Sequence, residues 1–169
     1  MFRLLNADEI DVRVSTINAK GATLLLYKDA RCDMNFLDEA VGAFNWKREH
    51  TRENANCIVS IWDKDKEQWV SKEDTGTESF TEKEKGLASD SFKRACFNWG
   101  IGRELYTAPF IYIPADKMSI TDKNGKYTTY DKFHVEAIKY DEKNQIVALS
   151  IKNQKNERVY VFNNIKKGE

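Results

Sequence analysis

The stretch that organises this chain is residues 81–106, which read TEKEKGLASDSFKRACFNWGIGRELY. Thr81 followed by Glu84 is a capping-box pattern, which marks the start of a helix. Small and apolar residues then recur at helical spacing on one face: Ala88, Ser91, Phe92, Ala95, Cys96 and Trp99. Gly100 supplies a C-terminal stop. The sequence therefore predicts one long helix that ends in a glycine-broken turn.

Five basic residues lie on this helix or just past it: Lys83, Lys85, Lys93, Arg94 and Arg103. Lys93 and Arg94 diverge by about 100° around the helix, so one can follow a backbone phosphate while the other reaches inward. Arginine forks onto a phosphate, whereas lysine acts as a point charge. The alternative is structural, because cations in the last turns of a helix complement its dipole by roughly a few tenths of a kcal/mol. From the helix alone, both interpretations stay open.

A second basic and aromatic group lies at residues 44–52, FNWKREHTR, with Trp46, Lys47, Arg48 and Arg52. Proteins that bind single strands combine positive charge with aromatic platforms, so this group favours nucleic-acid binding. Trp46 has a plain alternative as a core residue.

The remaining elements are mostly strands. Alternation predicts strands over 11–17 and 23–27 that form a hairpin across NAKG, and over 57–62 and 69–70, with a charged turn between them. A short helix is expected from the N-cap Asp29 to Gly42. Beyond Pro109 the chain is β-like to its end, with an Asn124-Gly125 turn. The fold class expected is α+β.

Composition indicates one globular domain of 169 residues, with 41% hydrophobic and 12% aromatic residues. No apolar run is long enough for a membrane span, and no signal peptide is recognisable, so a cytoplasmic protein is expected. Three cysteines, Cys32, Cys57 and Cys96, are expected to be buried thiols. The net charge is zero, which argues against a nucleic-acid partner overall. A local basic patch can still act alone, because salt screens charges beyond about 8 to 10 Å.

The sequence lacks the motifs that several kinds of active site require. A strand-exchange motor fuelled by ATP needs G-x-x-x-x-G-K-[ST], which this chain does not contain. The tripeptide Gly100-Ile101-Gly102 follows a helix, so a C-cap and turn is favoured over a phosphate loop. His50 and His134 are too few for a histidine-based triad or metal site. Neither a cofactor nor a metal is expected.

Two rival functions stay open. Asp29, Asp33, Asp38 and Glu39 could serve a magnesium-dependent nuclease, since two-metal hydrolysis needs converging carboxylates. On a helix these positions scatter around the axis, which favours a solvated polar face and a protein that is not an enzyme. The other rival is a protein-interaction module, in which FIYI (110–113) and the later strands bind a partner.

An ordered series of motifs resembles a known family. The series is YKDARCDMNFLDEAVGAFNW (27–46), the hairpin with EQWVSKEDTGTES (67–79), and ASDSFKRACFNWGIGRELY (88–106). It is similar to the Rad fifty-two-like single-strand annealing proteins, and most closely to their phage branch, the Sak-type recombinases. The resemblance covers roughly Ile10 to Ile113, and residues beyond Ile113 match no motif of the family.

The resemblance implies a β-β-β-α annealing core over residues 1–113, with residues 114–169 as a β-rich extension packed on the core. It implies closed rings of about ten subunits, with single-stranded DNA in a basic groove. The implied function is ATP-independent annealing in recombination and repair, in a bacterial host cell and from a phage or prophage. A host single-strand-binding protein and a phage exonuclease are the partners that stay open.

The family's principal DNA-contacting pair falls on Lys93 and Arg94, and Asp90 would orient the basic groups or the adjacent loop. The groove's other wall is assigned to Arg13 and Lys20. Further DNA contacts are expected from Lys85, Arg103, Lys47 and Arg48, with Trp46 in support. Arg31 matches the YKDAR motif, where it either touches DNA or braces the fold.

Overall fold

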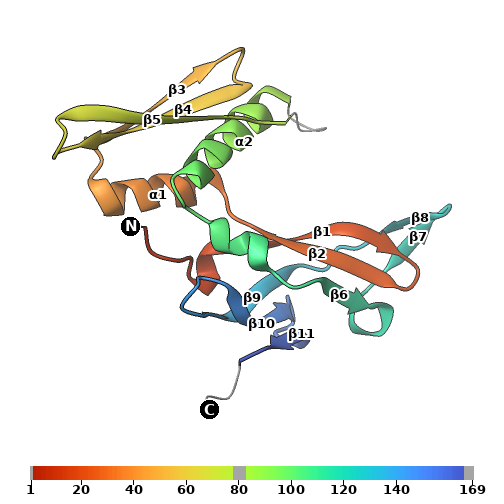
Figure 1. Ribbon diagram of the computed structural model, residues 1–169. Helices are drawn as coiled ribbons and strands as arrows, with labels where there is room; N and C mark the ends of the chain where they lie inside the picture. Colours follow the sequence, from red (N-terminus) through yellow and green to blue (C-terminus); the bar gives the residue numbers. More distant parts are fainter. Residues whose placement is uncertain (1, 78–82, 166–169) are drawn as a thin grey trace. The chain divides into compact units, whose positions relative to one another are not determined.

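The computed structural model describes residues 2–77 and 83–165, and no side chain within 83–85 (Figure 1). The chain forms two compact units that are interleaved in sequence. We call Met1–Arg3 with Asp29–Arg103 the helical unit, and Leu4–Lys28 with Glu104–Glu169 the sheet unit. This division differs from the predicted boundary between residues 113 and 114, because strands from both ends of the chain share one sheet.

The helical unit is a three-stranded antiparallel sheet with two helices. Its strands are β3 (Trp46–Thr51), β4 (Asn56–Asp63) and β5 (Gln68–Thr75), in the order β3-β4-β5. Helix α2 (Lys83–Asn98) packs on β4 and β5, and α1 (Ala30–Val41) packs beside α2 and β3. Strands β3, β4 and β5 followed by α2 give the chain order β-β-β-α (Figure 1).

Alternation along β4 supplies the core of this unit. Cys57 and Val59 are fully buried on one side of the strand, and Phe92, Ala95 and Cys96 are fully buried on α2. All three cysteines are buried with free thiols, as predicted. Burial raises the pKa of the Cys57 thiol to about 11, which keeps it protonated and unreactive at neutral pH.

Helix ends follow the residues that predict them. The Asp29 carboxylate accepts a hydrogen bond from the Cys32 amide at 2.9 Å, which starts α1. At the end of α2 the Gly100 amide donates to the Phe97 carbonyl, and the Ile101 amide donates to the Cys96 carbonyl. This is a Schellman motif, and Gly100 takes the positive φ of 102° that the motif requires. The Thr81–Glu84 capping box lies outside the described residues.

The sheet unit contains a six-stranded sheet in the order β11-β10-β9-β1-β2-β6. The strands are β1 (Asp11–Asn18), β2 (Gly21–Tyr27), β6 (Ile111–Pro114), β9 (Phe133–Tyr140), β10 (Ile146–Asn153) and β11 (Arg158–Asn163). The sheet curls until its outer strands approach each other, and the Tyr160 hydroxyl on β11 donates to the Phe110 carbonyl beside β6 at 3.1 Å. The buried side includes Leu24, Ile111, Ile113 and Ile151.

A separate hairpin joins β7 (Thr121–Lys123) to β8 (Lys126–Thr128). Asn124 and Gly125 both have positive φ, as the predicted Asn-Gly turn requires. The α+β class and the strands predicted beyond Pro109 are confirmed. Strand β3 was not predicted, because its sequence WKREHT is charged and lacks a clean apolar alternation.

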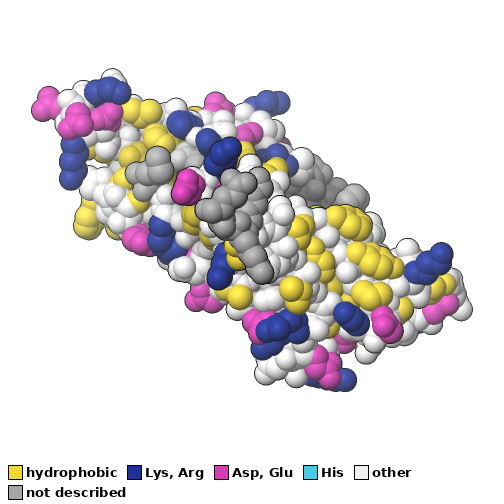
Figure 2. Space-filling model, turned by 60° about the horizontal axis from the view of Figure 1, so that its bottom comes forward, with side chains coloured by type: hydrophobic (Ala, Val, Ile, Leu, Met, Phe, Trp, Pro, Cys, Tyr) yellow, Lys and Arg dark blue, Asp and Glu magenta, His cyan; other side chains and the backbone are white. Residues whose placement is uncertain are grey.

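Surface charge is mixed. Lys and Arg side chains lie among Asp and Glu side chains over the face that Figure 2 shows, in keeping with the net charge of zero. In the described ranges, no helix has the length and apolar character that crossing a membrane demands.

Gly76 lets the chain after β5 lie directly on α2. A Cβ atom at this position would sit 2.6 Å from the Ser91 nitrogen and 2.9 Å from the Leu87 carbonyl oxygen. The Gly76 amide also donates to the Ala55 carbonyl at 2.7 Å. The segment is therefore held between the β3–β4 turn and the helix backbone, where only glycine fits.

Gly76→Ala should destabilise the protein by roughly 1 to 3 kcal/mol, because the new methyl group meets helix backbone that cannot rotate away. Urea denaturation followed by circular dichroism measures the change. Ser89→Ala, an exposed position on the same helix, is the control and should change stability little. An unchanged denaturation midpoint for Gly76→Ala would contradict the close approach.

Candidate nucleic-acid interface

Lys93 and Arg94 occupy adjacent positions on α2, on the part of the helix that does not enter the core. Lys93 is partly exposed and has no hydrogen-bond or ion-pair partner among the described residues. The Arg94 side chain is exposed, and its Nε donates to Asp90 Oδ2 at 3.0 Å, one helical turn earlier. One cation is thus unengaged and the other is oriented by a carboxylate.

Asp90 also accepts two hydrogen bonds from Thr77. The Thr77 amide donates to Asp90 Oδ2 at 2.8 Å, and the Thr77 hydroxyl reaches the same oxygen at 3.1 Å. Burial alone raises the pKa of Asp90, but the bonds from Thr77 and Arg94 outweigh it, and the pKa lies below its ordinary value. Asp90 therefore connects the segment after β5 to Arg94. Thr77 and Gly76 were not predicted as part of this site.

Trp46 and Arg48 lie against α2 rather than standing free. The Trp46 ring stacks on Phe92 with 6.1 Å between ring centroids, and its Nε1 donates to Asp38 Oδ1 at 2.6 Å. The Arg48 guanidinium lies 4.8 Å from the centre of the same Phe92 ring. Trp46 links β3, α1 and α2, which favours its core alternative over a free stacking platform.

Lys47 lies on the opposite face of the sheet from Arg48, because side chains alternate along a strand. Its Nζ is 4.6 Å from the centre of the Trp69 ring, and Trp69 meets Trp62 edge to face at 5.5 Å. Lys47 and Arg48 therefore cannot both face one groove, although they are neighbours in sequence.

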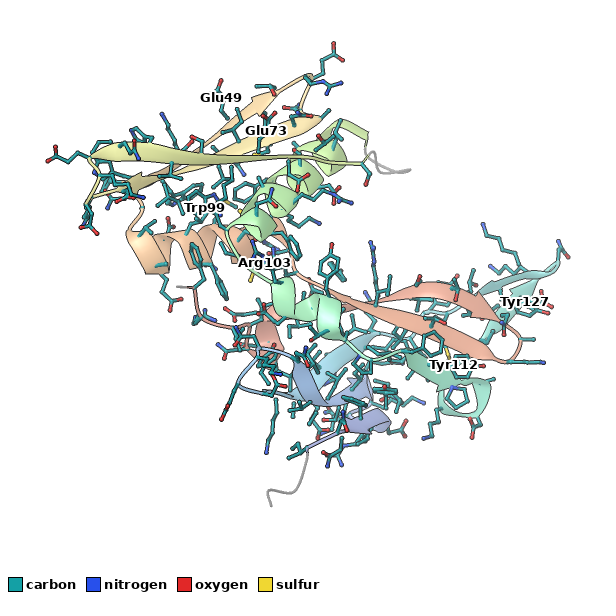
Figure 3. All side chains as sticks on the ribbon, viewed as in Figure 1. Glu49, Glu73, Trp99, Arg103, Tyr112 and Tyr127 are labelled. Atoms are coloured by element: carbon teal, nitrogen blue, oxygen red, sulfur yellow. The ribbon has the colours of Figure 1, made fainter. Side chains whose placement is uncertain are left out.

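Arg103 is engaged at the C-terminal end of α2, where Figure 3 labels it near Trp99. Its Nε donates to the Phe97 carbonyl at 2.8 Å, and a second nitrogen donates to the Asn98 carbonyl at 2.7 Å. Lys72 Nζ donates to the same Asn98 carbonyl at 2.8 Å. These bonds satisfy the helix end, which matches the dipole alternative for this arginine.

The other predicted cations fall in different places. Arg31 pairs with Asp29 at the start of α1 at 2.8 Å, so its described contact is local. Lys85 is in the first turns of α2, where its side chain lies outside the described part of the chain. Arg13 and Lys20 belong to the sheet unit, and a groove shared with Lys93 and Arg94 stays a prediction.

The acidic residues that the nuclease hypothesis would need lie in separate places, and most of them make structural contacts. Asp29 caps α1, Asp38 accepts from Trp46, and Glu39 pairs with Arg3 at 3.0 Å. Asp33 is fully buried. Over the described ranges, no three His, Cys, Asp or Glu side chains come together as a metal site would require.

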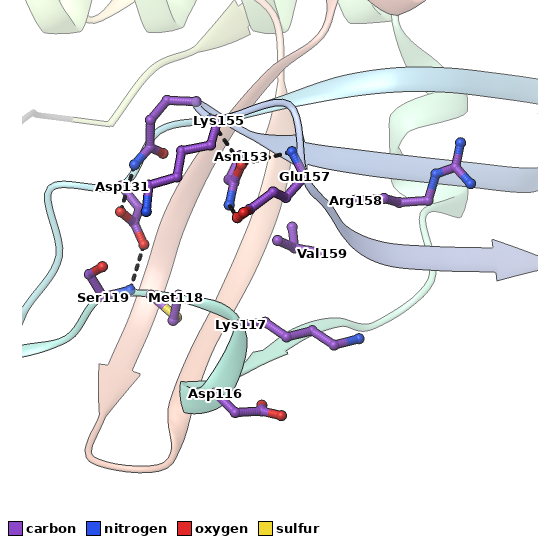
Figure 4. Close-up of a pocket in the computed structure, with 11 residues that line it drawn as sticks. Asp116, Lys117, Met118, Ser119, Asp131, Asn153, Lys155, Glu157, Arg158 and Val159 are labelled. Carbon is purple, nitrogen blue, oxygen red and sulfur yellow. Dashed lines mark hydrogen bonds between the residues drawn. The ribbon is translucent and has the colours of Figure 1, made fainter.

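A polar cavity of about 320 Å³ lies in the sheet unit, beside the β10–β11 turn (Figure 4). Asp131 accepts from the Ser119 amide at 2.6 Å and from the Gln154 amide group at 2.8 Å, and Asn153 donates to Glu157 at 2.8 Å. These polar groups of the lining are hydrogen-bonded to one another. We therefore interpret the cavity as part of the local hydrogen-bond network and not as a ligand site.

Comparisons with protein-family models, with curated proteins and with solved structures find no match for this chain. The assignment of a function therefore depends on the residues and their geometry.

Arg103→Ala should lower the free energy of unfolding by roughly 0.5 to 1.5 kcal/mol, because it removes a cation and two hydrogen bonds from the end of α2. The Phe97 carbonyl keeps its bond from the Gly100 amide, and the Asn98 carbonyl keeps its bond from Lys72. Thermal or urea denaturation measures this. Lys123→Ala, an exposed cation on the β7–β8 hairpin, is the matched control. Equal stability of Arg103→Ala and wild type would contradict the capping role.

Asp90→Asn should destabilise the protein at neutral pH and matter less in acid. The folded pKa of Asp90 is lowered from 3.8, so its stabilising effect is present above pH 3.8 and is lost as pH falls through the folded pKa. Urea midpoints of both proteins from neutral pH to about pH 3 should therefore converge. A constant gap over this range would show that the charge of Asp90 contributes nothing.

Proposed function

We propose that this protein binds single-stranded DNA and anneals complementary strands without nucleotide fuel, in phage-type homologous recombination and DNA repair. The observation that carries the proposal is the outward pair on α2. Lys93 has no bonded partner among the described residues, and Arg94 is held by Asp90 with its side chain exposed. A point charge beside an oriented guanidinium fork suits successive phosphates of one strand.

Two further features support the proposal. Strands β3, β4 and β5 followed by α2 have the β-β-β-α order that the Rad fifty-two-like resemblance implies. The SD-x-x-KRA motif, which carries that resemblance, is where Asp90 meets Arg94.

Annealing needs no bond chemistry. The protein holds one strand by its phosphates and leaves the Watson–Crick edges of its bases exposed, so that a second strand can test pairing. A ring of identical subunits repeats a modest patch many times, and the summed contacts give high affinity despite the zero net charge of each chain. The proposal therefore includes self-assembly into a ring.

Lys93→Ala combined with Arg94→Ala should abolish annealing of complementary oligonucleotides and weaken binding of a single strand. Each lost phosphate contact should reduce the slope of log affinity against log salt by about 0.7, so the double variant should lose about 1.4. Fluorescence anisotropy over a salt series measures the slope, and a strand-pairing assay measures annealing.

The matched control is Lys123→Ala with Lys126→Ala, which removes two exposed lysines from the β7–β8 hairpin. It should leave both measurements near wild type. Wild-type annealing by a folded Lys93/Arg94 variant of unchanged oligomeric state would refute the assignment. Shortening of a labelled strand in Mg²⁺ would instead favour the nuclease rival.

A further inference from the structure

The outer face of strands β1, β2 and β6 exposes large apolar side chains side by side. Leu25 is 43% exposed, Tyr112 is 38% exposed, and Phe110, directly before β6, is 76% exposed. Thr23 pairs with Tyr112 across β2 and β6, and alternation places Leu25 and Phe110 on the same side. We call Leu25, Phe110 and Tyr112 the apolar patch; Figure 3 labels Tyr112.

This exposure is not a by-product of poor packing. The opposite side of the same strands is closed, with Leu24, Ile111 and Ile113 at most 1% exposed. Sheets that bury one face normally keep the other face polar. Two exposed aromatic rings and a leucine in adjacent rows therefore indicate a surface with a binding role.

Tyr112 is held in position by the strand beneath it. A Cβ atom at Gly21 would lie 2.6 Å from the Tyr112 hydroxyl oxygen and 2.8 Å from the ring carbon that bears it. The ring end thus covers the Gly21 backbone, in a place where a side chain would displace it. The Tyr160 hydroxyl fixes the backbone at Phe110 through its carbonyl. Both aromatic residues sit on anchored backbone, so little ordering is needed when a flat ligand stacks on them.

Cations flank the apolar patch. Arg13 pairs with Leu25 across β1 and β2, and its guanidinium lies 5.4 Å from the centre of the Tyr27 ring. Lys20 lies in the exposed β1–β2 turn next to Gly21. In β1, β2 and β6, which are described throughout, the one acidic residue is Asp11, two positions from Arg13 on the same face. Asp116 and Lys117, which follow β6 near the Lys20 turn, carry one charge of each sign, so the cations outnumber the acids here. The charge at this surface therefore complements an anionic partner.

We propose that the apolar patch is a stacking platform for the bases of single-stranded DNA, with Arg13 and Lys20 beside it for the phosphates. Aromatic rings flanked by cations are the combination by which proteins hold single strands irrespective of sequence. This inference rests on the proposed function and adds a contact to the bases, whereas Lys93 and Arg94 contact phosphates.

The test compares a thymidine oligonucleotide with an abasic oligonucleotide of equal length, which keeps the phosphates and lacks the bases. Wild type should prefer the thymidine strand. Phe110→Ala with Tyr112→Ala should weaken binding of the thymidine strand by at least about tenfold and leave abasic binding unchanged. Phe110→Tyr with Tyr112→Phe, which keeps both rings, should retain the preference.

Lys93→Ala with Arg94→Ala should weaken both oligonucleotides alike, which separates phosphate contacts from base contacts. As a second measurement on unaltered protein, photocrosslinking of a 5-iodouracil strand should mark Phe110 or Tyr112 in a peptide map.

Three results would overturn the inference. If the patch variant binds both oligonucleotides with wild-type affinity, the stacking platform is refuted and the proposed function is unaffected. Loss of self-association with unchanged DNA affinity, seen by light scattering, would assign the apolar patch to contacts between copies of this chain. Failure of wild type to bind either oligonucleotide would overturn the proposed function together with the inference.

Discussion

The burial of Phe92, Ala95 and Cys96 against β4 fixes the rotation of α2 about its axis. Once this face is turned to the sheet, the helical period decides where every other residue of α2 points. Lys93 and Arg94 are left outside the core, on adjacent sides of the helix. The packing of apolar side chains therefore determines where the basic pair is displayed, and Gly76 allows the neighbouring segment to come close enough to hold Asp90.

Basic residues that are close in the sequence make different contacts in the structure. Arg103 and Lys72 satisfy carbonyl groups at the end of α2, Arg48 covers Phe92, and Lys47 lies over Trp69 on the other side of the sheet. A cation with a structural contact is not barred from binding DNA, but it gives up that contact to do so. Lys93 has no such contact among the described residues, so under the proposed function it would bind a phosphate without losing one.

Local signals in the sequence predicted the elements that depend on local physics. The hairpin at residues 11–27, the cap at Asp29 and the stop at Gly100 each follow from neighbouring residues. Strand β3 was not predicted, because its residues are charged and half-exposed and it is stabilised by pairing with β4, which no local pattern shows. The interleaved units were not predicted because the pairing of β1 with β9 joins residues far apart in the chain. For the candidate site, the KRA motif indicated Lys93 and Arg94, whereas Thr77 depends on a contact that no local pattern reports.

The curl of the six-stranded sheet has a consequence for how this chain meets other chains. Strands at the edge of a sheet offer unpaired backbone groups, and these invite pairing with any extended segment, including aggregation. Here β6 and β11 approach each other, and the bond from Tyr160 to Phe110 joins their margins. Where they meet, the two margins hinder the addition of another strand. The apolar patch belongs to a different surface of this sheet, because it is made of side chains on the face of β2 and β6 and not of backbone groups at an edge.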